Sequence, residues 1–363
     1  MKIVIAPDSF KGSLTAREAA QSIESGILKV LPEAECVSIP MADGGEGTVQ
    51  SLVDATGGRI MRVLVTDPLG HPTNAEYGIL GDGRTAVIEM AAASGIQYID
   101  ETTRNPLIAT TYGTGELIKD ALEQGVSDII VGLGGSATND GGAGMAQALG
   151  VRLLDDNGAP LPFGGAALAE LSEVDVSGLD PRLADVHIRL ASDVTNPLTG
   201  VRGASAVFGP QKGATPDMVE RLDDALAHYA AVIRKQLGRE VETVPGAGAA
   251  GGLGAGFLAF TEASMRSGVD LVIEATGLAG LAAGADYCFT GEGGIDFQTQ
   301  YGKTPMGVAR AVKQASPDCT VVALAGSIGE GIDQLYDLGI DAIFGIMPGV
   351  STMRDAVDLS LIH

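Results

Sequence analysis

The chain has 363 residues, of which 45% are hydrophobic and only 4% aromatic, a balance typical of aliphatic packing between parallel strands and covering helices. Its 23 Lys and Arg stand against 46 Asp and Glu, and the net charge of −23 excludes a broad surface for nucleic acid or an anionic membrane. The length predicts about two domains.

The N-terminal segment predicts two β-α units of a parallel sheet. Residues 2–6 form an apolar strand pattern, and Thr15 with Glu18 three residues later is a capping box that predicts a helix start. A second strand is predicted over residues 35–39, and the loop 41–48 opens into a second helix. A β-α-β-α order of this kind is typical of a parallel sheet covered by helices.

The pattern changes near residue 60. Three short strand-like runs at 62–66, 74–80 and 85–90 are separated by turn residues and predict an antiparallel meander. A helix over 114–122, a strand over 128–131 and a long helix over 217–237 follow.

Three further strands are predicted at the C-terminal end, over 287–290, 320–324 and 342–346. We therefore predict one discontinuous, doubly wound α/β domain formed by residues 1–60 and 285–363. A second α/β domain, residues 61–284, interrupts it, and we expect the active site in the cleft between the two domains.

The cysteines and the N-terminal sequence indicate the cellular compartment of the protein. Cys36, Cys288 and Cys319 lie in apolar segments without a CxxC pair, which predicts reduced, buried thiols. The chain begins directly with a strand pattern, and no apolar run approaches the ~18 residues of a membrane span. These features predict a cytoplasmic protein without a membrane or nucleic-acid partner.

A glycine-rich loop follows the strand at 128–131 and precedes a helix predicted to begin near Ala143. Its backbone N–H groups, together with a helix N-terminus, can cradle phosphate. The predicted phosphate-binding residues in this loop are Gly134, Gly135, Ser136, Thr138, Asn139, Asp140, Gly141 and Gly142. The structural alternative is a tight strand-to-helix turn that requires glycine at positive φ.

Two other readings of glycine motifs stay open. Gly132, Gly134 and Ala137 match a relaxed dinucleotide fingerprint, which would make the chain an NAD(P)-dependent hydroxy-acid dehydrogenase. In that motif, however, the helix begins at once. The segment Gly302-Lys303-Thr304 imitates the end of a Walker loop without its first glycine, although Lys303 can still meet a phosphate as a point charge.

Carboxylates recur where predicted strands end. Asp8 follows the first strand, Asp43 and Glu46 follow the second, Asp193 follows a strand at 188–191, and Glu292 and Asp296 follow the strand ending at 290. Each could be only a helix N-cap. Their repetition, together with Lys11 and Asn196, favours a shared polar site at the carboxyl ends of the strands. An aspartate that accepts a hydroxyl proton is typical of phosphoryl transfer.

These segments resemble the bacterial glycerate kinase family, in order and over nearly the whole chain. The resemblance is carried by residues 6–13 (APDSFKGS), 42–48 (ADGGEGT), 89–95 (EMAAASG), 134–145, 193–198 (DVTNPL), 208–213 (FGPQKG), 245–252 (PGAGAAGG) and 290–293 (TGEG). It implies a flavodoxin-like domain interrupted by a second α/β domain. It also implies ATP-dependent phosphorylation of D-glycerate with Mg²⁺, giving 2-phosphoglycerate, with 3-phosphoglycerate less favoured.

Within this family we assign roles as hypotheses. Lys11 and Lys212 hold the carboxylate of glycerate, and Ser9, Asn196, Glu292 and Asp296 complete its site. Asp193, or as a second choice Asp8, takes the hydroxyl proton. The glycine loop and Lys303 hold phosphates, and Asp43 and Glu46 hold Mg²⁺, a hard ion that prefers carboxylates. A homodimer is possible.

Two departures from the family pattern keep an alternative open. Gly294 stands where the family usually has an arginine, and the chain ends at His363, earlier than expected. They predict, as the alternative, a weak or inactive protein that senses glycerate by binding it without turnover.

Overall fold

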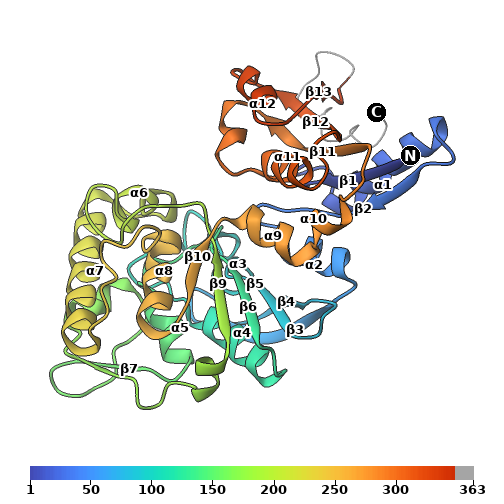
Figure 1. Cartoon of the computed structure of the whole chain (residues 1–363). Coiled ribbons are helices and arrows are strands. Elements are labelled where there is room, and N and C mark those ends of the chain that lie inside the picture. The colour runs from blue at the N-terminus through green and yellow to red at the C-terminus, as the bar shows by residue number, and fades with distance from the viewer. Residues whose placement is uncertain (348–363) are drawn as a thin grey trace. The chain divides into compact units, whose positions relative to one another are not determined.

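The computed structural model describes residues 1–347 and divides the chain into two units (Figure 1). The first comprises Met1–Gly58 and Ser267–His363, and the second comprises Arg59–Arg266. The C-terminal end at His363, on which part of the sensor alternative depends, lies outside the described residues.

The first unit is built on a five-stranded sheet in which every pair of neighbouring strands is parallel. The strand order is β13-β12-β11-β1-β2, which in chain order is the 2-1-3-4-5 arrangement of flavodoxin-like folds and confirms the predicted fold class. The strands are β1 (Lys2–Pro7), β2 (Glu35–Ser38), β11 (Tyr287–Ile295), β12 (Thr320–Ile328) and β13 (Ala342–Gly345).

Helices cover this sheet because consecutive residues of a strand such as β1 are apolar and point to opposite faces, so both faces must be buried. Ile3 and Ile5 pack with Ala20 of α1, and α11 contacts β1, β11 and β12. The capping box predicted at Thr15 and Glu18 is present at the start of α1. The helices are α1 (Ala16–Val30), α2 (Thr48–Thr56), α9 (Gly268–Thr276), α10 (Leu278–Leu281), α11 (Thr304–Ala315), α12 (Asp333–Asp337) and the 3₁₀ helix η5 (Phe297–Tyr301).

The chain re-enters the first unit earlier than the predicted residue 285. Helices α9 and α10 precede that position, yet α9 contacts α2 and α11, and α10 contacts α11. At the start of α9, a Cβ on Gly268 would stand 1.9 Å from the carbonyl oxygen of Asp43, so this glycine lets α9 lie directly on the loop after β2. These contacts explain why the unit boundary falls at Ser267.

The second unit contains a six-stranded mixed sheet of order β10-β9-β6-β5-β4-β3. The pairs β3–β4 and β4–β5 are antiparallel, which confirms the predicted meander, whereas β5, β6, β9 and β10 run parallel. The strands are β3 (Arg59–Thr66), β4 (Pro72–Ile79), β5 (Thr85–Glu89), β6 (Asp128–Gly132), β9 (His187–Ala191), β10 (Ser264–Arg266) and a separate pair, β7 (Arg152–Leu154) and β8 (Glu173–Asp175).

Two apolar clusters hold the second unit together. One joins the sheet to α4 and α8 through residues such as Leu117, Ile129 and Phe257, and the other joins α5, α7 and α8. The helices are α3 (Ala91–Ser94), η1 (Ile96–Tyr98), α4 (Tyr112–Glu123), α5 (Ala143–Ala148), η2 (Gly165–Glu170), η3 (Pro181–Asp185), α6 (Ala204–Phe208), η4 (Pro210–Lys212), α7 (Pro216–Leu237) and α8 (Ala249–Phe260). Among residues 1–347, no helix has both the length and the apolar character needed to cross a membrane.

Strand β11 extends well beyond its predicted end. The sequence predicts that β11 ends at residue 290, but its pairing with β12 continues as far as Ile295 opposite Ile328. Glu292 therefore lies on the strand itself, and the prediction that it follows the strand is wrong. Glycine weakens a strand by intrinsic preference, but here the ladder with β12 outweighs that preference.

The entry of α8 requires left-handed backbone. Ala250, Gly251 and Gly252 have φ values of 53°, 67° and 88° in succession. A Cβ on Gly251 would stand 1.9 Å from the carbonyl oxygen of Thr138, and the Gly251 carbonyl accepts a 3.0 Å hydrogen bond from Gly141. Only glycine allows this segment to lie against the loop after β6.

We predict that G251A lowers the free energy of unfolding by about 2–4 kcal/mol, because the added methyl group meets backbone and the residue is left-handed. The matched control is G26A in α1, where nothing lies within 4 Å of the added Cβ. G26A is expected to raise the free energy of unfolding by about 0.5–1 kcal/mol, since alanine is the better helix former. Urea unfolding measures both, and a G251A variant as stable as the wild type would contradict the close approach.

Candidate active site

A buried carboxylate, Asp8, and a partly buried one, Glu292, meet at the carboxyl edge of the sheet in the first unit. β1 and β11 are parallel with Pro7 opposite Gly291, and the backbone N–H of Asp8 donates to the Gly291 carbonyl over 2.9 Å. Asp8 and Glu292 therefore occupy neighbouring positions, and each charge raises the energy of the other. This edge is where open parallel sheets bind ligands.

The side chain of Asp8 is only 6% exposed. One carboxylate oxygen, Oδ1, accepts the backbone N–H of Ser9 over 2.6 Å, and Oδ2 accepts the hydroxyl of Thr304. Burial raises the pKa of Asp8 to about 6, with a further increase from Asp43 and partial offsets from Thr304, Ser9 and Lys11. A carboxylate with this pKa can take up a proton near neutral pH.

Glu292 has a similar environment. Burial raises its pKa to about 7 and the charge of Asp8 adds to the increase, while Lys303 and Thr299 lower it. The Lys303 ammonium lies 3.6 Å from Oε1 of Glu292, and the Thr299 hydroxyl donates to the same oxygen over 3.2 Å. Lys303, predicted to meet phosphate, is placed beside this carboxylate.

Asp296 has a local structural contact. Its carboxylate accepts the backbone N–H of Gln298 over 2.8 Å and forms a capping box with Thr299 at the start of η5. The N-cap explanation, weighed for every carboxylate at a strand end, therefore holds for this residue.

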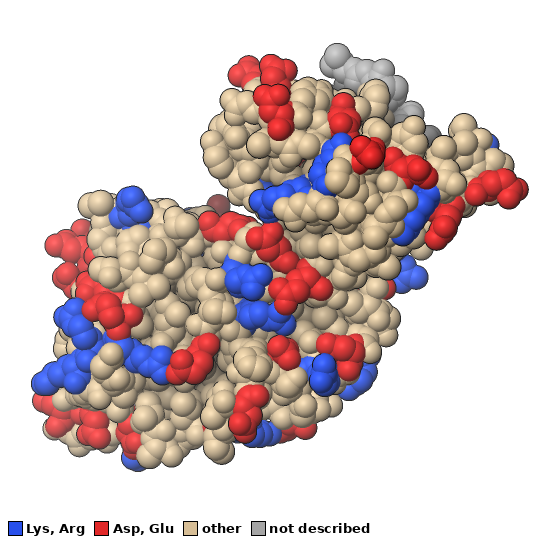
Figure 2. Space-filling view, viewed as in Figure 1, with Lys and Arg blue, Asp and Glu red and all other residues tan. Residues whose placement is uncertain are grey.

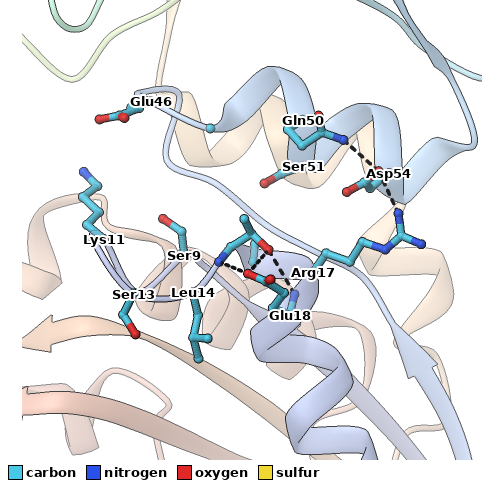
Figure 3. A pocket seen from close by; sticks show the side chains of 14 residues that line it. Ser9, Lys11, Ser13, Leu14, Arg17, Glu18, Glu46, Gln50, Ser51 and Asp54 are labelled. Carbon is cyan, nitrogen blue, oxygen red and sulfur yellow. Dashed lines mark hydrogen bonds and ion pairs between the residues drawn. The ribbon is translucent and has the colours of Figure 1, made fainter. Parts of the chain in front are cut away.

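A pocket of about 300 Å³ opens beside the loop after β1 and the starts of α1 and α2 (Figure 3). It brings together three predicted site residues, Ser9, Lys11 and Glu46. Gln50 and Ser51 also line it, and sequence reasoning missed both. The available signal was their position in the first turn of the helix that follows the predicted loop 41–48.

The far wall of this pocket is closed by a polar network. Gln50 donates to Oδ1 of Asp54 over 2.9 Å, and the Arg17 guanidinium lies 3.4 Å from the same oxygen. Figure 3 shows Lys11, Ser9 and Glu46 at the opposite end of the pocket from this group. Among the described residues that line the pocket, Lys11 is the cation left at that end to meet an anionic ligand.

The predicted Mg²⁺ ligands, Asp43 and Glu46, fit a site in which the protein supplies only one or two of the ligands. In residues 1–347, no three His, Cys, Asp or Glu side chains gather as a complete metal centre. Mg²⁺ in phosphoryl-transfer enzymes is usually held by one or two carboxylates and by substrate phosphates. Asp43, whose Oδ1 accepts the Gly45 N–H over 2.9 Å, and the exposed Glu46 provide that donor set.

The glycine loop of the second unit presents only its first residues to solvent. Gly134 and Gly135 are exposed, whereas residues 136–142 are buried. The Gly135 carbonyl accepts the N–H of Ile96 over 2.8 Å, and the N–H of Ala137 donates to Ser94 over 3.0 Å. The loop is therefore fixed on both sides of its exposed part.

The buried part of this loop is anchored by Asp140. Its carboxylate accepts the N–H and the hydroxyl of Thr111 over 2.8 and 2.9 Å, and the N–H groups of Gly142 and Gly144 over 3.1 and 3.2 Å. Burial raises the pKa of Asp140 and these hydrogen bonds oppose the increase. Gly141 and Gly142 are left-handed, as the tight-turn explanation predicted for part of the loop.

Lys212 lies in η4 beneath the same loop. The side chain is fully buried, and its ammonium donates to the carbonyl of Thr138 over 2.6 Å. Burial lowers the pKa of Lys212 to about 7, and the charge of Asp140 opposes the decrease. Lys212 thus holds the loop from within in this structure.

Three more predicted site residues of the second unit, Asn139, Asn196 and Asp193, have different environments. Asn139 donates from its side chain to Ser205 over 2.9 Å, and Asn196 donates to the carbonyl of Arg202 over 2.7 Å. Asp193, at the end of β9, is exposed. The helix after the glycine loop begins only at Ala143, which is unlike a dinucleotide fingerprint.

Parallel strands in flavodoxin-like order, with carboxylates at their carboxyl edge, define the chain as an α/β ligand-binding protein. A model of the glycerate kinase family matches residues 3–360. The glycerate kinase of Bacillus subtilis is 56% identical over 358 residues, covering 99% of this chain and 93% of that protein. The glycerate 2-kinase of Escherichia coli is 52% identical over 356 residues, covering 98% and 93%.

A crystal structure named as a glycerate kinase 2 of Salmonella typhimurium LT2 superposes with a TM-score of 0.91 at 52% identity, covering 99% of this chain and 94% of that one. The chain belongs to the glycerate kinase family and is an enzyme of the kinase class. The dehydrogenase and sensor alternatives are not favoured. At Gly294, where the sequence lacks the expected arginine, the Lys303 ammonium donates to the glycine's own carbonyl over 3.4 Å.

We predict that K212M lowers the free energy of unfolding by about 1–3 kcal/mol, because it leaves the buried carbonyl of Thr138 without its donor. The matched control is K235M in α7, an exposed lysine whose loss should change stability by less than about 0.5 kcal/mol. Thermal and urea unfolding measure both. A K212M variant of normal stability with a raised KM for the acid substrate would instead show that Lys212 contacts that substrate.

Proposed function

We propose that the chain transfers the γ-phosphoryl group of ATP to the 2-hydroxyl of D-glycerate, giving 2-phosphoglycerate, with 3-phosphoglycerate the less favoured product. The observation that carries the proposal is the buried, hydrogen-bonded Asp8 carboxylate at the carboxyl end of β1. The name of the glycerate 2-kinase relative supports the position of transfer.

Asp8 is the proposed general base, ahead of Asp193. Its raised pKa of about 6 leaves it mostly ionised at neutral pH and still able to accept a proton. As the phosphoryl group reaches the substrate oxygen, the hydroxyl proton passes to Asp8, and ADP leaves with the electron pair of the broken bond. Asp193, exposed at the end of β9, is the second candidate.

The pocket beside Lys11 is the proposed site for glycerate. Lys11 attracts the carboxylate of the substrate, and the hydroxyl of Ser9 can bond to it as well. Glu292, next to Asp8 on the adjacent strand, is proposed to bond to a substrate hydroxyl. The charge of Asp8 raises the pKa of Glu292, so Glu292 can keep a proton to donate in such a bond.

The phosphates of ATP are proposed to bind the exposed N–H groups of Gly134 and Gly135. Asp140 and Lys212 then act from beneath, by fixing this loop. Asp43 and Glu46 are proposed to hold Mg²⁺, which when bound would neutralise charge on the phosphates. That residues of both units serve one reaction is part of the proposal.

We also propose that the reaction takes place in the cytoplasm, where the three free cysteines would stay reduced. The homodimer stays a prediction, and light scattering on the purified protein tests it.

The test of the proposed function is ADP release from Mg·ATP with D-glycerate, followed by proton-coupled phosphorus NMR of the product. We expect glycerate-dependent ADP release and a doublet, because the 2-phosphate neighbours a CH group. A triplet would show transfer to the 3-hydroxyl. Glycerate binding by folded protein without ADP release would overturn the proposal in favour of a sensor.

We predict that D8N lowers kcat by about 10²–10⁴-fold, the usual contribution of a general base, and that D193N has the smaller effect.

The D8N substitution should also stabilise the fold. Because the pKa of Asp8 is raised from 3.8 to about 6, its favourable contribution is complete below 3.8 and is lost as pH rises through 6.

At pH 8, D8N should therefore raise the free energy of unfolding by about 1–3 kcal/mol, and by much less at pH 4. Steady-state kinetics and urea unfolding at the two pH values measure these effects. An inactive D193N beside an active D8N would assign the base to Asp193.

A further inference from the structure

A short segment at the start of α11 contacts both carboxylates of the candidate site. Gly302, with φ of 105°, turns the chain, Lys303 is the N-cap, and Thr304 is the first residue of the helix. The Lys303 ammonium lies beside Glu292 of β11, and the Thr304 hydroxyl donates to Asp8 after β1. In this structure, the segment that resembles the end of a Walker loop therefore contacts carboxylates.

We propose that Thr304 is a positioning residue for phosphoryl transfer: its hydroxyl fixes the Asp8 carboxylate in the orientation that receives the hydroxyl proton of glycerate. The inference rests on the proposed role of Asp8 as the base. Thr304 is fully buried, so it acts through Asp8 and does not itself touch the substrate.

The geometry supports this role because Asp8 has one donor on each oxygen. The Ser9 N–H holds Oδ1 and the Thr304 hydroxyl holds Oδ2, so rotation of the carboxylate breaks at least one hydrogen bond. A hydroxyl can also donate to the ionised acid and, after rotating, accept from the protonated acid. Thr304 can therefore stay bonded to Asp8 before and after the proton is transferred.

The charged groups around Asp8 come from three directions. Asp43 from the loop after β2 disfavours its ionised form, and Lys11 from its own loop favours it, while Glu292 on β11 has its own pKa raised by the charge of Asp8. Lys303 acts on Glu292. Thr304 carries no charge, so its replacement changes a hydrogen bond and leaves every one of these charges in place.

The hydrogen bond from Thr304 also lowers the pKa of Asp8 against the effect of burial. Without it, a larger fraction of Asp8 is protonated at neutral pH and cannot act as a base. The loss of activity should therefore grow as pH falls through neutral and should shrink in alkali, which a purely structural defect would not produce.

The experiment compares the kinetics of T304V and T304S with the wild type between about pH 5 and pH 9. For T304V, which keeps the shape of threonine, we expect kcat at neutral pH to fall about 10- to 100-fold, as for loss of a hydrogen bond to a charged group. The acid limb of its pH profile should move to higher pH with little change in KM. T304S, which keeps the hydroxyl, should stay within about threefold of wild type.

The control is T276V in α9, where the hydroxyl donates within its own helix, to the carbonyls of Val272 and Ile273. It should leave the kinetics unchanged. If T304V does not fold, T304A lacks the same hydroxyl and carries the same expectation.

Two results would overturn the inference alone: T304V with wild-type kcat and pH profile, or T304V and T304S equally slow with the acid limb unmoved. A wild-type chain that does not phosphorylate glycerate would overturn the proposed function, and this inference with it.

Discussion

The parallel pairing of β1 with β11 is the constraint on which the site depends. It brings Asp8 and Glu292, which are 284 positions apart in the chain, to one edge of the sheet. Two carboxylates withdrawn from solvent, one fully and one partly, destabilise each other. The fold surrounds them with compensating groups: the Ser9 N–H, the hydroxyls of Thr299 and Thr304, and the ammonium of Lys303. Residual destabilisation of this kind is what a general base near neutral pH requires.

The second unit uses buried polar groups for a different purpose. Asp140 and Lys212 contact backbone and neighbouring side chains instead of facing solvent, and they fix the glycine loop so that only Gly134 and Gly135 are exposed. On the face drawn in Figure 2, acidic and basic side chains lie in small mixed groups among uncharged residues. Anion binding in such an acidic chain is left to a few local N–H groups and lysines.

Much of the fold could be predicted from the sequence, because apolar runs, turn residues and the Thr15 capping box are local signals. The burial of the polar site residues could not be predicted from the sequence. Lys212 meets Thr138 across 74 positions and Asp140 meets Thr111 across 29, so no local pattern distinguishes these buried anchors from ligand-binding side chains. In the same way, Asp296 caps η5, whereas Asp8, equally placed after a strand, receives a hydroxyl from the distant Thr304.

We propose that Asp8 is a buried carboxylate whose raised pKa lets it accept a proton near neutral pH. The most direct measurement is a ¹³C NMR titration of aspartate carboxyl carbons in the labelled protein, with the spectrum of D8N assigning the Asp8 signal. We expect an apparent pKa for Asp8 of about 6. A midpoint at or below the ordinary value of 3.8 would contradict it, because the ionised carboxylate would then be too weak a base for this role.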